Sequence, residues 1–237
     1  MVADGRNDTE RDPGVLTTLV GMIAAGSTHS VANFCCGAIS DMVEHPEVLE
    51  AVRAEILEKH EEIGGRWDMA SVTSLVKLDS AMKETSRLTP GTLIIYARIV
   101  QKDCLLSNGI LLKRGQSIAL SSSARTRDPE FYEDPDEYKG LRFCTEDKIA
   151  EHQKRPFSSV DPDILTWGAG RWSCPGRVIG DIAAKILLVK ALSGYDFAFV
   201  DKDKPLGRGK THEFIYFNPE NEMLVRRRED APEIVFC

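Results

Sequence analysis

The first helix that the hydrophobic pattern predicts is long and apolar on most of its faces. It runs from Gly14 to Glu44, after a polar start at residues 1–13. It ends at His45-Pro46, because the residue before a proline is pushed out of the helical conformation. A helix that is apolar all round is a buried helix in a globular protein. We therefore expect this helix to lie in the core.

Shorter elements follow the long helix. The pattern predicts a surface helix at residues 46–60, a further helix at 78–88 and a β-strand at 93–100. An Asn-Gly pair within residues 105–112 is typical of a tight hairpin between two short strands. Residues 121–166 contain three Asp-Pro pairs, so we expect this segment to cross the surface with little regular structure.

The last predicted helix covers residues 175–193, with Gly194 at the position after its final turn. Its apolar stripe is expected to face inward and consists of Val178, Ile179, Ile182, Ala183, Ile186 and Leu187. Short strands are expected at residues 195–200, 213–217 and 222–226. Together these elements predict a mainly α protein with small antiparallel β-sheets, which is an α+β fold.

The composition is that of an ordinary globular protein. The chain has 237 residues, of which 42% are hydrophobic and 28% charged, enough for one or two domains. Its formal net charge of −7 argues against a broad nucleic-acid surface, because phosphates would be repelled. The apolar run from Val15 to Gly26 is shorter than the roughly twenty residues that a membrane span needs. We expect no spanning segment, signal peptide or transit peptide.

The cysteines and histidines suggest neither a disulfide framework nor a zinc site. No CxxC pair occurs, and the five histidines show no paired metal spacing. Most of the six cysteines are expected to be small buried hydrophobes. The six are Cys35, Cys36, Cys104, Cys144, Cys174 and Cys237. No glycine loop of the dinucleotide-binding type precedes a helix, so we expect no flavin or nicotinamide site in this chain.

One cysteine has a distinctive setting. Cys174 lies in a glycine-rich loop immediately before the last helix, and Pro175 suits the first helical turn. Glycines let the backbone approach a flat ligand, and a helix N-terminus favours a thiolate, which binds metals. A glycine-rich turn around a structural cysteine is the alternative interpretation of this loop on its own.

The loop resembles the haem-binding signature of the cytochrome P450 family, in which an aromatic residue, glycines and a cysteine follow at fixed spacing. The resemblance implies haem b, with Cys174 as the axial ligand of the iron. It also implies a cofactor-binding set drawn from this loop and one strand arginine that pairs with a haem propionate. That set is Arg98, Trp167, Gly170, Arg171, Cys174 and Gly176.

Two further patterns agree with this resemblance. Glu84 and Arg87 match the ExxR motif of the family, and their spacing places both on one helix face. Arg142 stands where the family has the arginine that completes a buried Glu-Arg-Arg network. An isolated ExxR is also a common surface ion pair. Here the ExxR motif, Arg142 and the cysteine loop follow one another in the order found in the family. The resemblance therefore implies a structural cluster beneath the cysteine loop rather than a catalytic acid or base.

A stretch of small residues inside the long helix matches the distal-helix motif of the family. There the resemblance implies that Thr28 delivers protons to bound oxygen. Close packing between helices is the alternative explanation of these small residues.

The sequence departs from the family at Ser27, where many members have an acidic residue. It departs again at Trp172, where Arg or His normally contacts a propionate, so that contact would have to come from Arg171 or be lost.

The resemblance covers residues 14–228 and corresponds to the C-terminal half of the family fold. A typical member is about twice as long. We therefore expect one partial haem-thiolate domain over residues 14–228, with a polar tail at 1–13 and a second tail at 229–237.

The resemblance implies a haem-thiolate monooxygenase that oxidises a small lipophilic substrate with oxygen. Its motifs are most similar to those of fungal members that oxidise secondary metabolites, terpenoids among them. Electrons are expected from NADPH-cytochrome P450 reductase or a similar donor. Full-length relatives are typically bound to the endoplasmic reticulum membrane, whereas this chain is expected to be soluble or peripheral. Two alternatives stay open: a truncated remnant without activity, and a haem-binding module without turnover.

Overall fold

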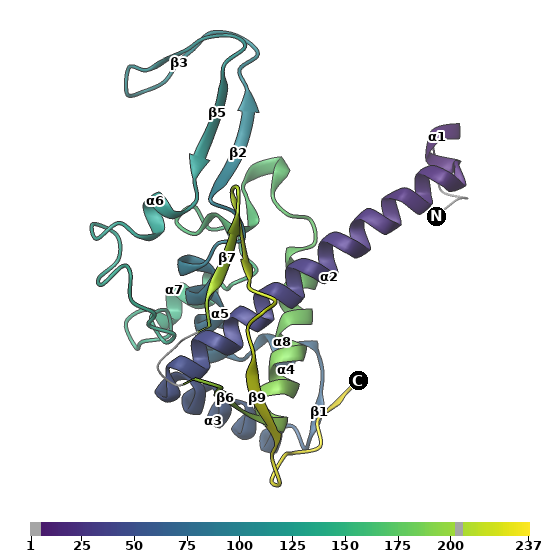
Figure 1. Cartoon of the computed structure of the whole chain (residues 1–237), viewed down its shortest axis with the longest axis vertical. Helices are drawn as coiled ribbons and strands as arrows, with labels where there is room; N and C mark the ends of the chain where they lie inside the picture. The colour runs from purple at the N-terminus through teal and green to yellow at the C-terminus, as the bar shows by residue number, and fades with distance from the viewer. Residues whose placement is uncertain (1–5, 202–205) are drawn as a thin grey trace.

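The computed structural model describes residues 6–201 and 206–237. A helical body carries two projections (Figure 1). One is the start of the longest helix, and the other is a β-ribbon formed by residues 94–121. The α-helices are α1 (Asp8–Arg11), α2 (Pro13–Glu44), α3 (Pro46–Glu62), α4 (Met69–Thr73), α5 (Val76–Leu88), α6 (Ser123–Thr126), α7 (Ile149–Lys154) and α8 (Arg177–Gly194). The bounds of α2, α3 and α5 agree with the sequence prediction to within two residues.

The strands pair two by two. They are β1 (Arg66–Trp67), β2 (Ile94–Ile99), β3 (Cys104–Leu105), β4 (Leu111–Leu112), β5 (Ser117–Ser121), β6 (Tyr195–Phe199), β7 (Arg208–Thr211), β8 (Phe214–Phe217), β9 (Met223–Arg227) and β10 (Val235–Phe236). The pairs β2–β5, β3–β4, β6–β9 and β7–β8 are antiparallel, while β1 and β10 are parallel. The predicted α+β class is confirmed, including the hairpin at Asn108-Gly109 between β3 and β4.

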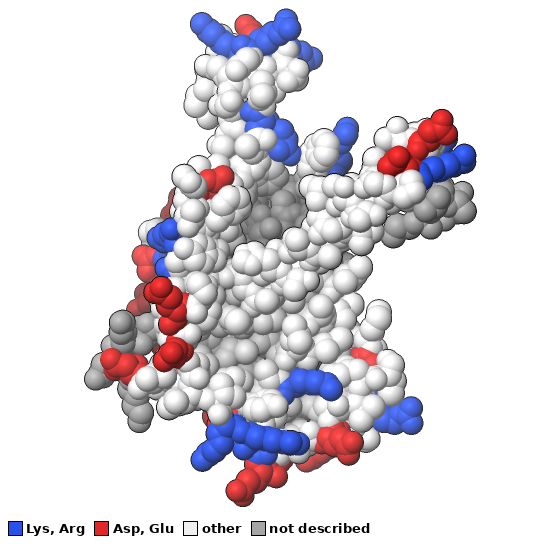
Figure 2. All heavy atoms as spheres, turned by 45° about the vertical axis from the view of Figure 1, so that its right-hand side comes forward, with Lys and Arg blue, Asp and Glu red and all other residues white. Residues whose placement is uncertain are grey.

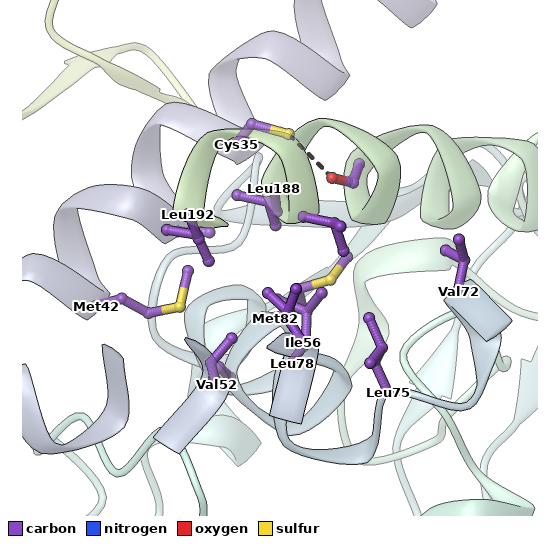
Figure 3. Packing of buried hydrophobic residues seen from close by; sticks show 14 of the residues in the cluster. Cys35, Met42, Val52, Ile56, Val72, Leu75, Leu78, Met82, Leu188 and Leu192 are labelled. Carbon is purple, nitrogen blue, oxygen red and sulfur yellow. Dashed lines mark hydrogen bonds between the residues drawn. The ribbon is translucent and has the colours of Figure 1, made fainter. Parts of the chain in front are cut away.

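The core lies where four helices meet. The second half of α2 packs against α5 and α8, and α3 packs against all three of these helices. Figure 3 shows apolar side chains of all four helices pointing into one cluster, with a hydrogen bond from Cys35 Sγ to the Ala184 carbonyl across α2 and α8. The most deeply buried members include Met42, Val52, Ile56, Leu78, Met82, Leu188 and Leu192.

The first half of α2 corrects one expectation. Burial begins only at Val31, and the exposed residues before it include Met22 and Ile23, which are 67% and 69% exposed. Between Asp12 and Asp41 the helix has no charged side chain, and in Figure 2 it projects as an uncharged arm with charges at its end. Among the described residues no element covers this half, so the prediction of a fully buried helix was wrong.

The same helix corrects the expectation about membrane spans. α2 contains an 18-residue window of mean hydropathy 1.4, none of which is buried. By length and composition it is able to cross a membrane, whereas the sequence interpretation considered only the shorter run from Val15 to Gly26. The small residues and hydroxyls that follow that run do not lower the hydropathy enough to end the apolar segment.

α8 turns a different face to the core from the one expected. Its buried residues are Asp181, Ala184, Lys185, Leu188, Val189, Leu192 and Ser193. By contrast, Val178, Ile179 and Leu187 are 50%, 75% and 52% exposed. The expected inward stripe was therefore wrong by about one residue, because two charged residues are buried as ion-paired groups. Gly194 is the last residue of the helix and has no left-handed φ, so it does not form the expected C′ cap.

The cysteines and the chain ends also differ in part from expectation. Only Cys35 is buried, while Cys36, Cys104 and Cys237 are exposed. Cys36 faces solvent on α2, while Cys104 lies in the short strand β3 and Cys237 at the C-terminus, so the expectation that most cysteines are buried was wrong. At the C-terminal end, residues 229–237 return to the body, where β10 pairs with β1 and Ile234 is 9% exposed. At the N-terminal end, residues 1–5 of the expected tail lie outside the described residues, and α1 follows them.

Candidate active site

A cavity of about 530 Å³ lies between the start of the β-ribbon and the loop that precedes α8. Its volume falls within the roughly 300–1,000 Å³ typical of small-molecule and cofactor sites. The ribbon contributes Ile95, Tyr96 and Arg98, and the loop contributes Trp167 and Cys174. The cavity therefore brings together three of the residues that the sequence singled out: the cysteine, the aromatic residue of its loop and the strand arginine.

The backbone of the loop is folded tightly around Cys174. Gly168 and Gly170 have φ values of 72° and 60°, in the left-handed region that glycine adopts at little cost. The Cys174 amide donates a hydrogen bond of 2.7 Å to the Trp167 carbonyl, which closes the loop. A Cβ at Gly168 would lie 3.4 Å from the Trp172 carbonyl oxygen, so the turn leaves little room for a side chain there.

Cys174 itself is partly exposed and lines the cavity. The helix α8 begins three residues later, with Gly176 at its N-cap. A Cβ at Gly176 would lie 4.0 Å from the Cys174 sulfur, so the backbone approaches the thiol closely at this point. The Arg177 guanidinium donates a 3.1 Å hydrogen bond to the Cys174 carbonyl. The backbone of the cysteine is thus tied down while its side chain borders the cavity.

Trp167 separates the cavity from the protein interior. Its indole nitrogen donates a hydrogen bond of 2.5 Å to the Phe157 carbonyl, and the two rings pack edge to face with centroids 5.1 Å apart. On its other side, a Cβ at Gly180 of α8 would meet the indole ring at 3.8 Å. These contacts hold the indole as a fixed wall of the cavity.

The ribbon side of the cavity carries polar groups. Tyr96 has a φ of 54°, unusual for a residue other than glycine, and the register of β2 with β5 shifts between Ile95 and Arg98. The Tyr96 hydroxyl is buried and has no hydrogen-bond partner among the described residues. Arg98 uses one nitrogen to bond the Ala97 carbonyl. The strained backbone and the unpartnered hydroxyl are typical of a binding site.

Two arginines flank an exposed tryptophan beside the cavity. The Arg98 and Arg171 guanidiniums lie 5.8 Å and 4.7 Å from the Trp172 ring centroid. Trp172 is 65% exposed and lines the cavity together with Arg98, whereas Arg171 is not part of the lining. Two cations stacked on one aromatic ring concentrate positive charge at this edge of the site. Such an edge suits an anionic group.

The charge network beneath the site is fully buried. Glu84 accepts hydrogen bonds from Arg87 at 2.7 and 2.8 Å and from Arg142 at 2.9 Å. The side chains of Glu84 and Arg87 are 0% exposed, and that of Arg142 is 6% exposed. The remaining guanidinium nitrogens donate to carbonyls between Thr126 and Glu137. The three residues therefore form one buried cluster, and the motif is not a surface ion pair in this chain.

Comparison with known proteins agrees with this geometry. The family model for cytochrome P450 matches residues 3–225. The chain belongs to the cytochrome P450 family. It is 34% identical to cytochrome P450 monooxygenase bsc5 of Alternaria brassicicola over 98% of this chain and 42% of that relative. It is 30% identical to dideacetyl fusicoccin A C-19 hydroxylase of Phomopsis amygdali over 90% of this chain and 40% of that relative.

The chain thus spans less than half the length of these curated relatives. The family consists of haem-thiolate proteins that use iron protoporphyrin IX, and the relatives are named monooxygenases and hydroxylases. The assignment to the P450 family and the family's haem cofactor, both expected from the sequence, are therefore confirmed, whereas a monooxygenase activity of this chain stays a prediction.

The residues around the cavity fit a haem group. A thiol at one wall supplies the soft axial ligand, and Arg98 and the unpartnered Tyr96 hydroxyl supply donors suited to carboxylates. Trp167 and Ile95 add apolar surface for a flat macrocycle. The donor set matches a group that is apolar in the middle and anionic at one edge.

Other P450 residues expected from the sequence lie outside the cavity lining. Thr28 is exposed on the uncovered half of α2, and its neighbour Ser27 bonds only the Ala24 carbonyl of its own helix. Gly170 and Gly176 shape the loop rather than the cavity wall. Thr28 as the proton-delivering residue therefore stays a prediction.

Sequence analysis missed two features of this P450 site. The strained Tyr96 has no sequence signal, since its conformation arises from the register shift in β2. A second buried charge cluster, formed by Asp79, Lys83, Asp161 and Lys185, joins segments that are distant along the chain. Asp181 and Lys185, four residues apart on α8, were a signal for it in the sequence, because this spacing places them on one helix face.

Proposed function

We propose that this chain forms the haem-binding part of a P450 monooxygenase that oxidises a small lipophilic secondary metabolite. The observation that carries the proposal is the cavity wall formed by Cys174, Trp167 and Arg98. Two of the relatives are named as hydroxylases of fusicoccin-type compounds, which supports a lipophilic substrate of similar size.

In this mechanism, haem supplies the iron that activates oxygen for insertion into a substrate C–H bond. Cys174 would hold the iron through its thiolate, and the tied backbone of its loop would fix the position of the sulfur. Arg98 and Tyr96 would orient the macrocycle through its propionates, and Trp167 would pack against it and exclude water. Thr28 would deliver protons from the distal helix α2.

Electrons would come from a separate protein, NADPH-cytochrome P450 reductase or a similar donor. A reductase-linked oxidation of a lipophilic substrate is the activity to assay in the protein reconstituted with haem.

The decisive test concerns ligation. The reduced carbon-monoxide complex of the haem-loaded protein should show the red-shifted Soret band of a thiolate ligand, and Cys174→Ala should abolish that band. Cys144→Ala is the matched control, because Cys144 is also partly buried but lies outside the cavity lining. Persistence of the band in Cys174→Ala would remove this cysteine from the role, and with it the proposed function.

A further inference from the structure

Asp79 is a buried carboxylate on α5 with partners on both sides of the cysteine loop. Asp79 is 3% exposed. Oδ2 accepts a 2.8 Å hydrogen bond from the Phe157 amide, and Oδ1 accepts one from the Lys185 ammonium. His152 of α7 places Nε2 3.0 Å from Oδ2. One carboxylate thus contacts three separate segments.

Two of these partners lie on opposite sides of the cysteine loop along the chain. Phe157 precedes the loop that contains Cys174, and Lys185 follows it on α8. Asp79 therefore holds both ends of the segment 157–185 against the same turn of α5. Each end has a buried ion pair nearby.

The two ion pairs near the ends of this segment are similarly buried. At the first end, Lys83 of α5 pairs with Asp161 at 2.8 Å, and their side chains are 6% and 8% exposed. At the other end, Lys185 also pairs at 3.1 Å with Asp181 of its own helix α8, which orients the lysine side chain towards Asp79 but adds no second link to α5. Because α5 carries both Asp79 and Lys83, it serves as the anchor for the whole segment.

Direct contacts lead from Asp79 to the cysteine. The Phe157 amide bonds Asp79, the Phe157 carbonyl accepts from the Trp167 indole, and the Trp167 carbonyl accepts from the Cys174 amide. Each step is a hydrogen bond between neighbouring groups. A shift of Phe157 would therefore move the wall of the cavity and the backbone of the cysteine.

The cluster is charged in the folded protein. Burial opposes the ionisation of Asp79, but its contacts with His152 and Lys185 outweigh that effect and hold the pKa of the carboxyl below its ordinary value. Burial likewise opposes the charge on Lys185, and its carboxylate partners raise the pKa of the ammonium above its ordinary value. Hydrogen bonds to ionised groups are the stronger kind, which suits a rigid tie.

We propose that Asp79 is a positioning residue that fixes the Cys174 loop by tying Phe157 and Lys185 to α5. It touches none of the groups that line the cavity and acts through Phe157 and Trp167. The Glu84 network has a separate task, since its donors bond the segment from Thr126 to Glu137 rather than the cysteine loop. The consequence for iron ligation rests on the proposed function, whereas the tie itself does not.

The test variant is Asp79→Leu combined with Lys185→Met. Replacing a buried ion pair by apolar residues of similar volume is often neutral for stability. Burial raises the pKa of Asp181, so this carboxyl can take up a proton once Lys185 is gone, and the protein should stay folded while both ties are lost. The control is Glu55→Gln, because Glu55 is likewise tied to backbone amides, at Lys77 and Leu78. Glu55 belongs to α3 and accepts from the amides of the first turn of α5, so this control removes a buried contact of α5 that does not involve the cysteine loop.

The first measurement is the alkylation rate of each cysteine in the haem-free protein, by peptide mass spectrometry. In the double variant, Cys174 should react about tenfold faster, since two hydrogen bonds to a charged group are gone. The buried Cys35 and the partly buried Cys144 should be unchanged. In Glu55→Gln all three rates should match those of the wild type.

Two outcomes would overturn the positioning role. An unchanged Cys174 rate would show that the ties do not hold the loop, and a parallel rise at Cys35 and Cys144 would show a loss of overall stability only. In the haem-loaded protein, the thiolate Soret band of the carbon-monoxide complex should weaken in the double variant and stay at wild-type strength in Glu55→Gln. A wild-type protein that takes up haem but lacks that band would refute the proposed function, and the alkylation result would still decide the role of Asp79.

Discussion

Replacing Glu84 by alanine is the sharpest test of the buried network. The carboxylate accepts two hydrogen bonds from Arg87, one from Arg142 and one of 3.0 Å from the Lys139 amide. Without it, two guanidiniums stay buried and keep only carbonyl partners, which do not neutralise their charge. Removing one partner from a buried ion pair costs about 3–5 kcal/mol. That is a large part of the roughly 5–15 kcal/mol that stabilises a typical folded protein.

The loss is measurable by urea unfolding followed by circular dichroism. With a denaturant slope of about 3 kcal/mol per M, the midpoint for Glu84→Ala should fall by about 1–1.7 M. Glu62→Ala is the matched control, because Glu62 also pairs with a basic residue three positions away but its side chain is 65% exposed. Its midpoint should change by less than about 0.3 M. A Glu84→Ala midpoint as close to the wild type as this control would refute the structural role of the network.

Three further results are expected. Iodoacetamide at pH 8 should modify the exposed Cys36 and spare its neighbour Cys35, because burial raises the pKa of the Cys35 thiol to about 12; similar rates would contradict this. Burial opposes ionisation of Asp79 and Asp161, but their cationic partners hold both pKa values below the ordinary one of about 3.9. The stability that these two ionised carboxylates contribute is therefore complete above about pH 3.9 and is lost as the pH falls through their folded pKa values. In Asp161→Asn, the urea midpoint should fall less steeply over this pH range than in the wild type. Finally, the 237-residue chain should retain haem poorly on gel filtration, since each ~200 Å² of apolar macrocycle left in water costs about 5 kcal/mol; stoichiometric retention would contradict this.

Elements with local signals could be predicted well from the sequence. The prolines after His45 and Thr89 mark the ends of α2 and α5, which stop at Glu44 and Leu88. The hairpin at Asn108-Gly109 likewise has the left-handed glycine, with a φ of 84°, that such a turn requires. Each of these features depends on residues that are adjacent in the chain, so no knowledge of distant partners is needed.

The inward face of α8 could not be found in this way. Its buried positions form a regular stripe with the spacing of a helix, but that stripe includes Asp181 and Lys185. A pattern based on hydrophobicity assigns charged residues to the solvent, and so it selected the neighbouring face with Val178 and Ile179. The charges are buried because Asp79 of α5 lies opposite them, a contact between residues 106 positions apart in sequence.

The uncovered half of α2 shows a second limit. Hydrophobicity indicates that a surface must be covered, but it does not indicate what covers it. The same exposed stretch satisfies a membrane-span criterion and also corresponds to the distal helix of a family whose members are more than twice as long as this chain. The expected role of Thr28 depends on which of these surfaces the helix faces, because proton delivery requires the hydroxyl to lie within a closed pocket.

The helix α5 carries one set of charges whose pairing was predictable from the sequence and one set whose partners were not. Glu84 and Arg87 are three residues apart, so their pairing was visible in the sequence, and the structure places them at 2.7 Å with no exposure. Asp79 and Lys83 belong to the same helix but pair with distant segments, and nothing in the sequence joined them to the cysteine loop. Because every residue from Leu78 to Arg87 is buried, both sets of charges need partners inside the protein. The Glu84 set holds the segment from Thr126 to Glu137, and the Asp79 and Lys83 set holds Phe157, Asp161 and Lys185 on either side of the cysteine loop, so a single helix orders two separate stretches of the chain.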